Sequence, residues 1–217
     1  WYTLPTWPPK STPLTLRLDK GKLTTDRTVT PWSAHFDCDP SNPVPTLGGP
    51  NLQMTGMKAG PYDQREIEQH GDVIALRGDP LDKRVTIAGA VTARLYVSTD
   101  AVDTDVMVKL VDVYPDGRSL LVADRAMRLS WWCRQHELGA VQPGRVYEIS
   151  FSVGERAWVF ERGHRIGFDV QASNYPRFDV NPGTGAQLSD DRMVVQHNVL
   201  HAGPLEPSGF VLPLYSP

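Results

Sequence analysis

The chain has 217 residues, with 22 basic and 25 acidic side chains and a formal net charge of −3. That balance argues against a nucleic-acid partner, because proteins that neutralise phosphates carry a clear basic excess. Hydrophobic residues make up 40% of the chain, which is enough for a core, and no run approaches the length of a membrane span, so we expect no membrane partner. The 18 glycines and 19 prolines favour many turns and short strands over a helical bundle.

We expect one domain over residues 1–217, because no repeat or linker divides the chain. Residues 1–11 are rich in proline and tryptophan and are interpreted as an N-terminal arm that needs a surface to lie on. Because the chain begins with Trp1 rather than Met, we expect its first residue to be a boundary and not a natural start. Residues 36–61 contain Asp-Pro, Asn-Pro and Gly-Gly steps that predict a long irregular loop, and loops of that length are often functional.

Apolar and polar side chains alternate along residues 85–97, which predicts a strand with one buried face. Gly89, in the middle of that strand, indicates a bend or a bulge. Further strands are predicted at 12–18, 72–77, 105–114, 119–132, 147–153, 166–172, 193–200 and 209–214, with turns at 114–118 and 162–164 and at most a short helix at 62–70. About nine strands joined by turns predict a sandwich of two sheets.

The cysteines and histidines give no strong sign of a metal site. Cys38 and Cys133 are interpreted as two reduced thiols, with a single disulfide as the alternative. His197 and His201 have the spacing of two ligands on one helix face, but their segment is predicted to be a strand and a loop. We therefore predict no metal site and no cofactor, since the sequence also contains no phosphate loop or dinucleotide motif.

The acidic segment 100–105 contains Asp100, Asp103 and Asp105. Clustered carboxylates are ligands for calcium, but short acidic side chains also organise tight loops by accepting backbone hydrogen bonds. We favour the loop interpretation and leave calcium open. Arg162, Arg165 and Arg177 lie close to acidic residues in the sequence and are interpreted as surface ion pairs.

The search for a nucleophile finds no candidate. None of the serines lies in a Gly-x-Ser-x-Gly elbow, and Ser173, at the end of a strand, is interpreted as structural. Trp131 and Trp132 are adjacent on a predicted strand, so one should face inward and the other outward. An outward Trp could stack on a sugar, so a carbohydrate-binding module is the alternative function. We therefore predict no catalytic residues in this chain.

Several motifs occur together in a characteristic order, from Trp7-Pro8-Pro9 to Leu212-Pro213. The segments are 39–49, 59–65, 98–105, 109–117, 163–166, 173–185 and 207–213, which include Asn42-Pro43-Val44-Pro45-Thr46-Leu47-Gly48-Gly49 and Ser173-Asn174-Tyr175-Pro176-Arg177-Phe178-Asp179. Their order resembles the C-terminal domain of the cocaine esterase / X-Pro dipeptidyl-peptidase family of serine hydrolases, which includes α-amino-acid ester hydrolases.

The resemblance implies a jelly-roll β-sandwich similar to galactose-binding domains. It also implies that the Ser-Asp-His triad belongs to a preceding α/β-hydrolase domain, so that this chain is not an enzyme on its own. That catalytic domain is the implied partner; a homo-oligomer stays open. The loop 36–61 would face the catalytic domain, and Leu52, Gln53 and Met54 would form part of the wall of the acyl pocket. We expect an exposed apolar patch near residues 1–9 and 47–57.

Overall fold

The computed structural model describes residues 3–4, 6–51, 56–186 and 192–216. Its regular structure is almost entirely β, as the glycine and proline content and the alternating patterns predicted. The strands are β1 (Thr12–Asp19), β2 (Lys22–Thr24), β3 (Trp32–His35), β4 (Ile74–Arg77), β5 (Val85–Thr99), β6 (Asp105–Val113), β7 (Ser119–Arg128), β8 (Tyr147–Phe160), β9 (Arg165–Gln171), β10 (Asn198–Ala202) and β11 (Gly209–Leu214). One short 3₁₀ helix, η2 (Ile67–Gln69), and one α-helix, α1 (Leu129–Gln135), complete the described elements. None of these helices is long and apolar enough to cross a bilayer.

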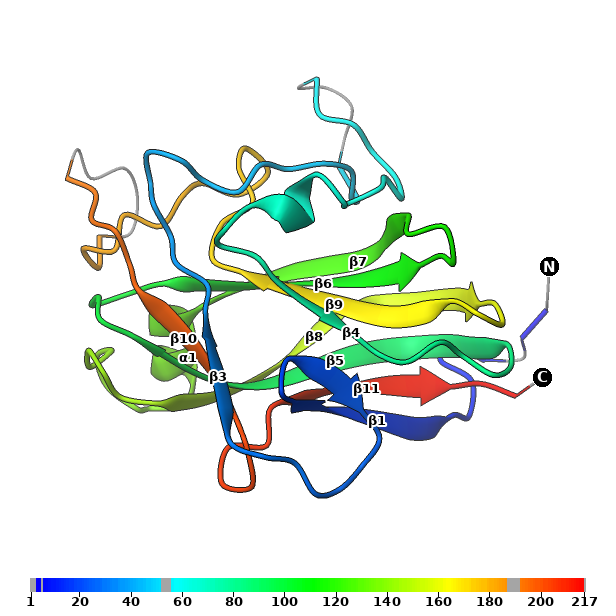
Figure 1. Cartoon of the computed structure of the whole chain (residues 1–217). Coiled ribbons are helices and arrows are strands. Elements are labelled where there is room, and N and C mark those ends of the chain that lie inside the picture. The colour runs from blue at the N-terminus through cyan, green and yellow to red at the C-terminus, as the bar shows by residue number, and fades with distance from the viewer. Residues whose placement is uncertain (1–2, 5, 52–55, 187–191, 217) are drawn as a thin grey trace.

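The strands form two stacked layers that are joined at one edge, with β6, β7 and β9 above β5, β11 and β1 (Figure 1). The upper layer runs β4-β9-β6-β7, and the lower layer is centred on the long strand β5, which pairs with β8 on one edge and with β11 and β10 on the other. A single parallel contact between Lys22 and Arg77 connects the layers. This arrangement is the predicted β-sandwich. Its similarity to galactose-binding domains stays a prediction.

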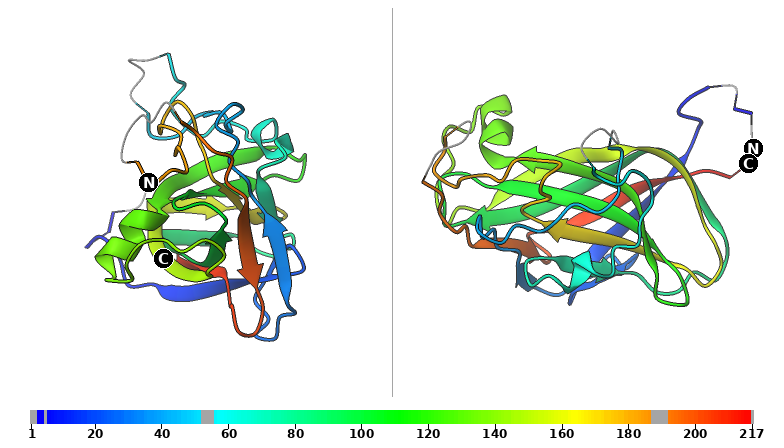
Figure 2. Two further views of the ribbon diagram at one scale, coloured as in Figure 1. Left: turned by 90° about the vertical axis from the view of Figure 1, so that its left-hand side faces the viewer. Right: turned by 90° about the horizontal axis from the view of Figure 1, so that it is seen from above.

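The core lies between the layers, where the alternating residues of each strand point inward. Phe168 on β9 and Phe210 on β11 are fully buried and stack across the layers with ring centroids 3.7 Å apart. The two ends of the chain meet at one end of the sandwich, since Thr12 pairs with Leu214, whereas α1 lies at the opposite end (Figure 2). Trp7, before β1, donates from Nε1 to Glu155 on β8 at 2.7 Å.

Several predicted boundaries were wrong. The strand predicted at 119–132 ends at Arg128, and Trp131 and Trp132 lie on α1 instead. The reason is a distant carboxylate: Asp103 accepts hydrogen bonds from the backbone N–H and the hydroxyl of Ser130 and so satisfies the first turn of the helix. The strand predicted at 147–153 continues to Phe160, because all of β8 pairs with the long strand β5.

The remaining differences concern short elements. The strand predicted at 193–200 begins at Asn198, and the short helix at 62–70 is reduced to η2. The pattern did not reveal the strands β2 and β3, which have three and four residues. Gly89 lies in continuous strand and gives room to Pro8 and Pro213, while the register shift comes between Val91 and Thr92.

Candidate functional site

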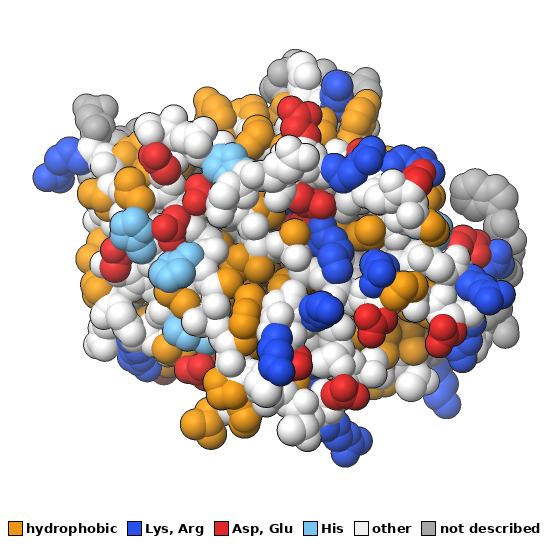
Figure 3. Space-filling view, in the orientation of Figure 1, with side chains coloured by type: hydrophobic (Ala, Val, Ile, Leu, Met, Phe, Trp, Pro, Cys, Tyr) orange, Lys and Arg blue, Asp and Glu red, His pale blue; other side chains and the backbone are white. Residues whose placement is uncertain are grey.

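One outer face of the sandwich carries nearly all of the long connections. The described residues of 36–72 and 172–186 cover the outer face of β9, β6 and β7, and we call this the loop-bearing side (Figure 1). In the space-filling view, hydrophobic side chains lie along the upper rim, over these loops (Figure 3). The predicted irregular loop at 36–61 has this character, since its described residues form only isolated bridges.

The two long loops, 36–51 and 172–186, are joined to each other by hydrogen bonds. The backbone N–H of Thr46 donates to the carbonyl of Tyr175 at 2.7 Å, and that of Tyr175 donates to Val44 at 3.0 Å. Ser173 is buried, and its hydroxyl accepts the backbone N–H of Val44 at 2.9 Å. Ser173 thus joins the two loops through its side chain, and the segments 36–51 and 172–186 form one unit.

The segment that contains the predicted pocket wall projects from this unit. Leu52, Gln53 and Met54 lie outside the described residues, but the base of their segment is described. Gly49 and Gly60 exchange two backbone hydrogen bonds of 2.9 Å. Gly48, at φ +74°, is required to be glycine, because a Cβ there would lie 2.5 Å from the carbonyl oxygen of Gly60.

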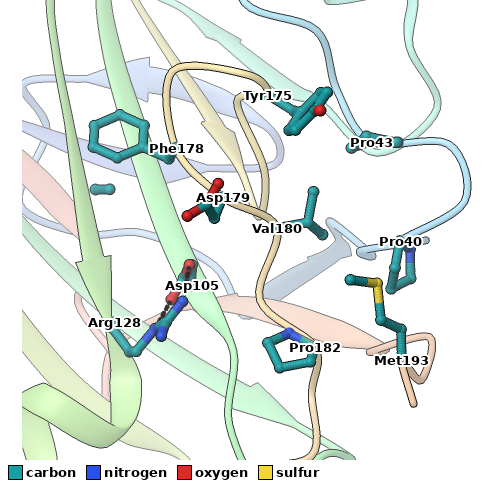
Figure 4. Close-up of a pocket in the computed structure, with 11 residues that line it drawn as sticks. Pro40, Pro43, Asp105, Arg128, Tyr175, Phe178, Asp179, Val180, Pro182 and Met193 are labelled. Atoms are coloured by element: carbon teal, nitrogen blue, oxygen red, sulfur yellow. Dashed lines mark hydrogen bonds and ion pairs between the residues drawn. The ribbon is translucent and has the colours of Figure 1, made fainter. Parts of the chain in front are cut away.

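A groove of about 920 Å³ opens between the loops and the ends of β6 and β7 (Figure 4). Its walls are mostly apolar, and its floor is the ion pair of Arg128 with Asp105. The lining residues are Pro40, Pro43, Asp105, Ala126, Arg128, Tyr175, Phe178, Asp179, Val180, Pro182 and Met193. Tyr175 and Met193 are about half exposed, as are the neighbouring Val194 and Val195. Exposed apolar side chains of this kind, gathered at one groove, are typical of a surface that another polypeptide covers.

The aspartates of the acidic segment 100–105 accept hydrogen bonds at and near the floor of the groove. Asp105 accepts two hydrogen bonds from Arg128, at 2.8 and 3.1 Å, and a third from Asn181. Asp103 accepts bonds from Ser130, while Asp100 accepts the backbone N–H of His197. Burial raises the pKa of Asp105 above its usual range, against the opposing effect of Arg128. These carboxylates organise loops and a helix terminus, as the loop interpretation predicted.

A row of buried charges lies under the loops on the same sheet face. Lys109 on β6 pairs in register with Asp169 on β9 and Asp124 on β7, and none of the three is more than 7% exposed. Arg77 forms an ion pair of 2.9 Å with Asp169, and Arg177 forms one with Asp124. Burial lowers the pKa of Lys109 and raises the pKa of Asp169 to about 6. The interpretation of Arg177 as a surface ion pair was therefore wrong, because its partner is buried.

The other candidates from the sequence do not come together. His197 contacts Asp37 at 2.9 Å, whereas His201 contacts the hydroxyl of Ser98 at 2.8 Å. No group of three or more His, Cys, Asp or Glu side chains within the described residues is arranged to hold a metal ion. Cys38 and Cys133 are buried free thiols, as expected, and burial raises the pKa of Cys38 to about 12.

The tryptophan pair does not form an open platform. Trp131 is 47% exposed at the tip of α1. The ring of Trp132 stacks on His136 at 3.7 Å, and its Nε1 donates to the carbonyl of Glu148. Trp132 is therefore already engaged within the domain, which weakens the argument for a sugar site formed by the pair.

Comparison with known proteins places the chain in a family. Residues 1–209 match the family described as the X-Pro dipeptidyl-peptidase C-terminal non-catalytic domain. The cocaine esterase of Rhodococcus sp. (strain MB1 Bresler) is 38% identical over 197 residues, which cover 89% of this chain and 34% of that protein. The chain thus spans about a third of the length of the curated relatives it matches.

Solved structures share the fold. An aminopeptidase from a marine sediment archaeon, Thaumarchaeota archaeon, superposes with a TM-score of 0.87 at 23% identity, over 100% of this chain and 39% of that one. An α-amino acid ester hydrolase superposes with a TM-score of 0.81 at 24% identity, over 93% of this chain and 36% of that one. The chain therefore belongs to the family of X-Pro dipeptidyl-peptidase C-terminal non-catalytic domains, which form the C-terminal part of larger hydrolases.

Proposed function

We propose that this chain is the non-catalytic part of a serine ester or peptide hydrolase, and that it packs its loop-bearing side on an α/β-hydrolase catalytic domain. The observation that carries the proposal is the match to a non-catalytic family over residues 1–209, in a chain about a third as long as its relatives. The absence of a Gly-x-Ser-x-Gly elbow from the sequence supports it. The chain alone is inactive in this proposal.

The loop-bearing side is suited to this contact. Its groove has mostly apolar walls, and the charges of Arg128 and Asp105 on its floor are paired with each other. A polypeptide that covers the groove therefore buries apolar area without leaving a buried charge unpaired. Tyr175 and Met193 stand half exposed at its rim. Interfaces between parts of one polypeptide are commonly built from such mixed surfaces.

Leu52, Gln53 and Met54 form part of the acyl-pocket wall in this proposal. Side chains that line a pocket without touching the reacting atoms affect which acyl group fits, so they alter the discrimination between substrates more than the barrier of the chemical step. Replacing Leu52 and Met54 with Ala in the longer hydrolase should therefore change KM values between esters of different acyl size. Leu205→Ala is the matched control, since Leu205 is 92% exposed in a separate turn.

The proposal is tested by comparing the 217-residue chain with the longer hydrolase. We expect the longer protein to hydrolyse p-nitrophenyl butyrate and to be labelled by an organophosphonate probe outside these 217 residues. The chain alone should show background turnover and no label. Comparable turnover by the chain alone, or a labelled serine within it, would contradict the proposal.

A further inference from the structure

Gln64 occupies a central position under the loop-bearing side. It is fully buried, and its side-chain amide is bonded at both ends. Its Oε1 accepts from Lys109 Nζ at 3.0 Å, while its Nε2 donates to the carbonyls of Leu47 at 2.8 Å and Tyr62 at 3.0 Å. Leu47 and Tyr62 flank residues 48–61, so one side chain joins the two ends of the segment that bears the proposed pocket wall.

The backbone around Gln64 fixes this side chain to the upper sheet. The N–H of Gln64 donates to the carbonyl of Ser119 at 2.7 Å, and the N–H of Leu121 donates to Tyr62 at 3.1 Å. Asp63 lies between Tyr62 and Gln64 in the sequence. It forms a β-bridge with Leu120, and its carboxylate accepts the backbone N–H of Ser119. Residues 62–64 therefore lie beside the start of β7, held by one isolated bridge and its flanking hydrogen bonds, and the amide of Gln64 contacts Lys109 on β6.

Lys109 determines which way the Gln64 amide faces. An ammonium group donates hydrogen bonds and accepts none, so the atom of Gln64 that faces it must be the oxygen. The two donors of the amide nitrogen are then directed at the carbonyls of Leu47 and Tyr62, which accept. The carbonyls of Leu47 and Tyr62 require the same orientation, and a neutral apolar side chain at position 109 would leave the amide oxygen without a partner in a dry environment.

The buried aspartates on the neighbouring strands make a buried lysine at position 109 possible. Asp169 and Asp124 face Lys109 from the neighbouring strands, and each also pairs with an arginine from the segments above or beside the sheet. The two carboxylates attract the ammonium electrostatically, which offsets part of the cost of burying it. The row therefore presents one fixed donor to the loop layer at the position of Gln64.

We propose that Gln64, bonded to Lys109, is a positioning residue that fixes the described ends of the segment, residues 47–51 and 56–62, on the sheet, and that in the longer hydrolase it thereby affects the acyl pocket. The last clause rests on the proposed function; the positioning itself does not. The backbone pair of Gly49 and Gly60 and the bonds of Asn51 to Gly48 and Lys58 hold the segment closed at the surface, whereas Gln64 connects it to the core.

Trypsin provides a direct readout, because Lys58 is exposed within the segment and Arg118 is exposed in a separate turn of β6–β7. Gln64→Met keeps the volume and removes the amide. Losing the hydrogen bonds to Leu47 and Tyr62 should speed cleavage after Lys58 by about tenfold or more. Cleavage after Arg118 should stay unchanged. Gln69→Met, an exposed glutamine in η2, is the matched control and should leave both rates unchanged.

A second variant, together with a measurement of thermal unfolding, distinguishes the loss of the amide from a general loss of folding. Gln64→Glu keeps an oxygen toward Lys109 but turns the other oxygen toward the carbonyls of Leu47 and Tyr62, so cleavage after Lys58 should again accelerate although the contact with the ammonium persists. The midpoint of thermal unfolding, measured in parallel, identifies any variant that has unfolded. Wild-type cleavage after Lys58 in both folded variants would overturn the inference.

The consequence for the pocket is measured in the longer hydrolase. Gln64→Met should raise KM for p-nitrophenyl butyrate several-fold with a smaller change in kcat, and Gln69→Met should change neither. Faster cleavage after Lys58 with an unchanged KM would support the positioning by Gln64 and contradict the placement of residues 52–54 in the pocket. The two failures are thus distinguishable.

Discussion

The two faces of β6 are both buried, yet they are built from opposite chemistry. Toward the core, Val106, Val108 and Leu110 are fully buried among apolar side chains. Toward the loops, Lys109 is equally buried, and the residues paired with it on the two neighbouring strands are both aspartates. The first face holds the two layers together without directional bonds, whereas the second holds the loops in one orientation through ion pairs and hydrogen bonds.

The comparison shows how a sandwich of this kind can carry a specific surface. Apolar packing tolerates small shifts as long as volume is conserved, but a charged row leaves a buried group unpaired if a loop moves. The segments that need a defined position, 44–49 and 173–178, are connected to the charged face. The apolar face therefore provides most of the stability, and the charged face fixes the position of the loops.

The largest effect should come from the apolar face. Phe168→Ala removes one ring of the stack with Phe210 and leaves a cavity between the layers, so we expect the free energy of unfolding to fall by about 3–5 kcal/mol. Phe178→Ala, on the loop-bearing side and partly exposed, is the control and should cost less than half as much. Urea unfolding measures both. Equal losses would contradict the difference between the two faces.

The next effect tests the charged face. Lys109→Met removes the buried ammonium that attracts Asp169 and Asp124, and we expect the free energy of unfolding to fall by about 3 kcal/mol at pH 7. The loss should be smaller at pH 5, where a buried carboxyl with a raised pKa takes up a proton and no longer needs a partner. Urea unfolding at the two pH values checks this. The same loss of unfolding free energy at both pH values would show that Lys109 does not stabilise the chain through these carboxylates.

Asp169 should make stability depend on pH in a recognisable direction. Burial raises its pKa in the folded chain from 3.8 to about 6, so the folded state holds the proton more tightly than the unfolded state. The free energy of unfolding should therefore fall as the pH rises from about 4 to about 6 through this group. Asp169→Asn should flatten that part of the profile. A profile as steep as that of the wild type would assign the dependence to another group.

The smallest effect is expected outside both faces. Trp131→Ala should change the free energy of unfolding by less than about 0.5 kcal/mol, because Trp131 is 47% exposed at the tip of α1. Trp132→Ala should cost more, since it removes the stack on His136 and the bond to Glu148. Equal effects in urea unfolding would show that the tip of α1 is packed more tightly than described.

The apolar face could be predicted from the sequence, and the charged face could not. Alternation along 85–97 identifies the core side of β5 because its two faces differ in polarity. On β6 nothing in the sequence indicates that Lys109 is buried, since lysine side chains are ordinarily exposed to solvent. It lies buried because residues 62–64 and 173–178 cover it, and those loops have no periodic pattern that would place them there.

The candidate site, too, is built from loops whose contacts no sequence pattern reveals. The irregular loop was expected, but its partner segment 172–186 was not, since their contact depends on long-range bonds between Thr46 and Tyr175. The expected apolar patch at 1–9 and 47–57 includes the exposed Trp7, while other large exposed side chains lie elsewhere: Tyr175 on the second segment, and Met193 closer to β10. The helix at Trp131 and Trp132 was missed because its cap, Asp103, is distant in sequence.

In the proposed function, the catalytic domain covers the loop-bearing side. Hydrogen exchange tests this directly, by comparing the 217-residue chain alone with the same residues in the longer hydrolase. We expect slower exchange at Tyr175–Asp179 and around Lys58 in the longer protein, and unchanged exchange in the turn at 115–118. Unchanged exchange on the loop-bearing side, with new protection on β3 and β10 instead, would contradict it.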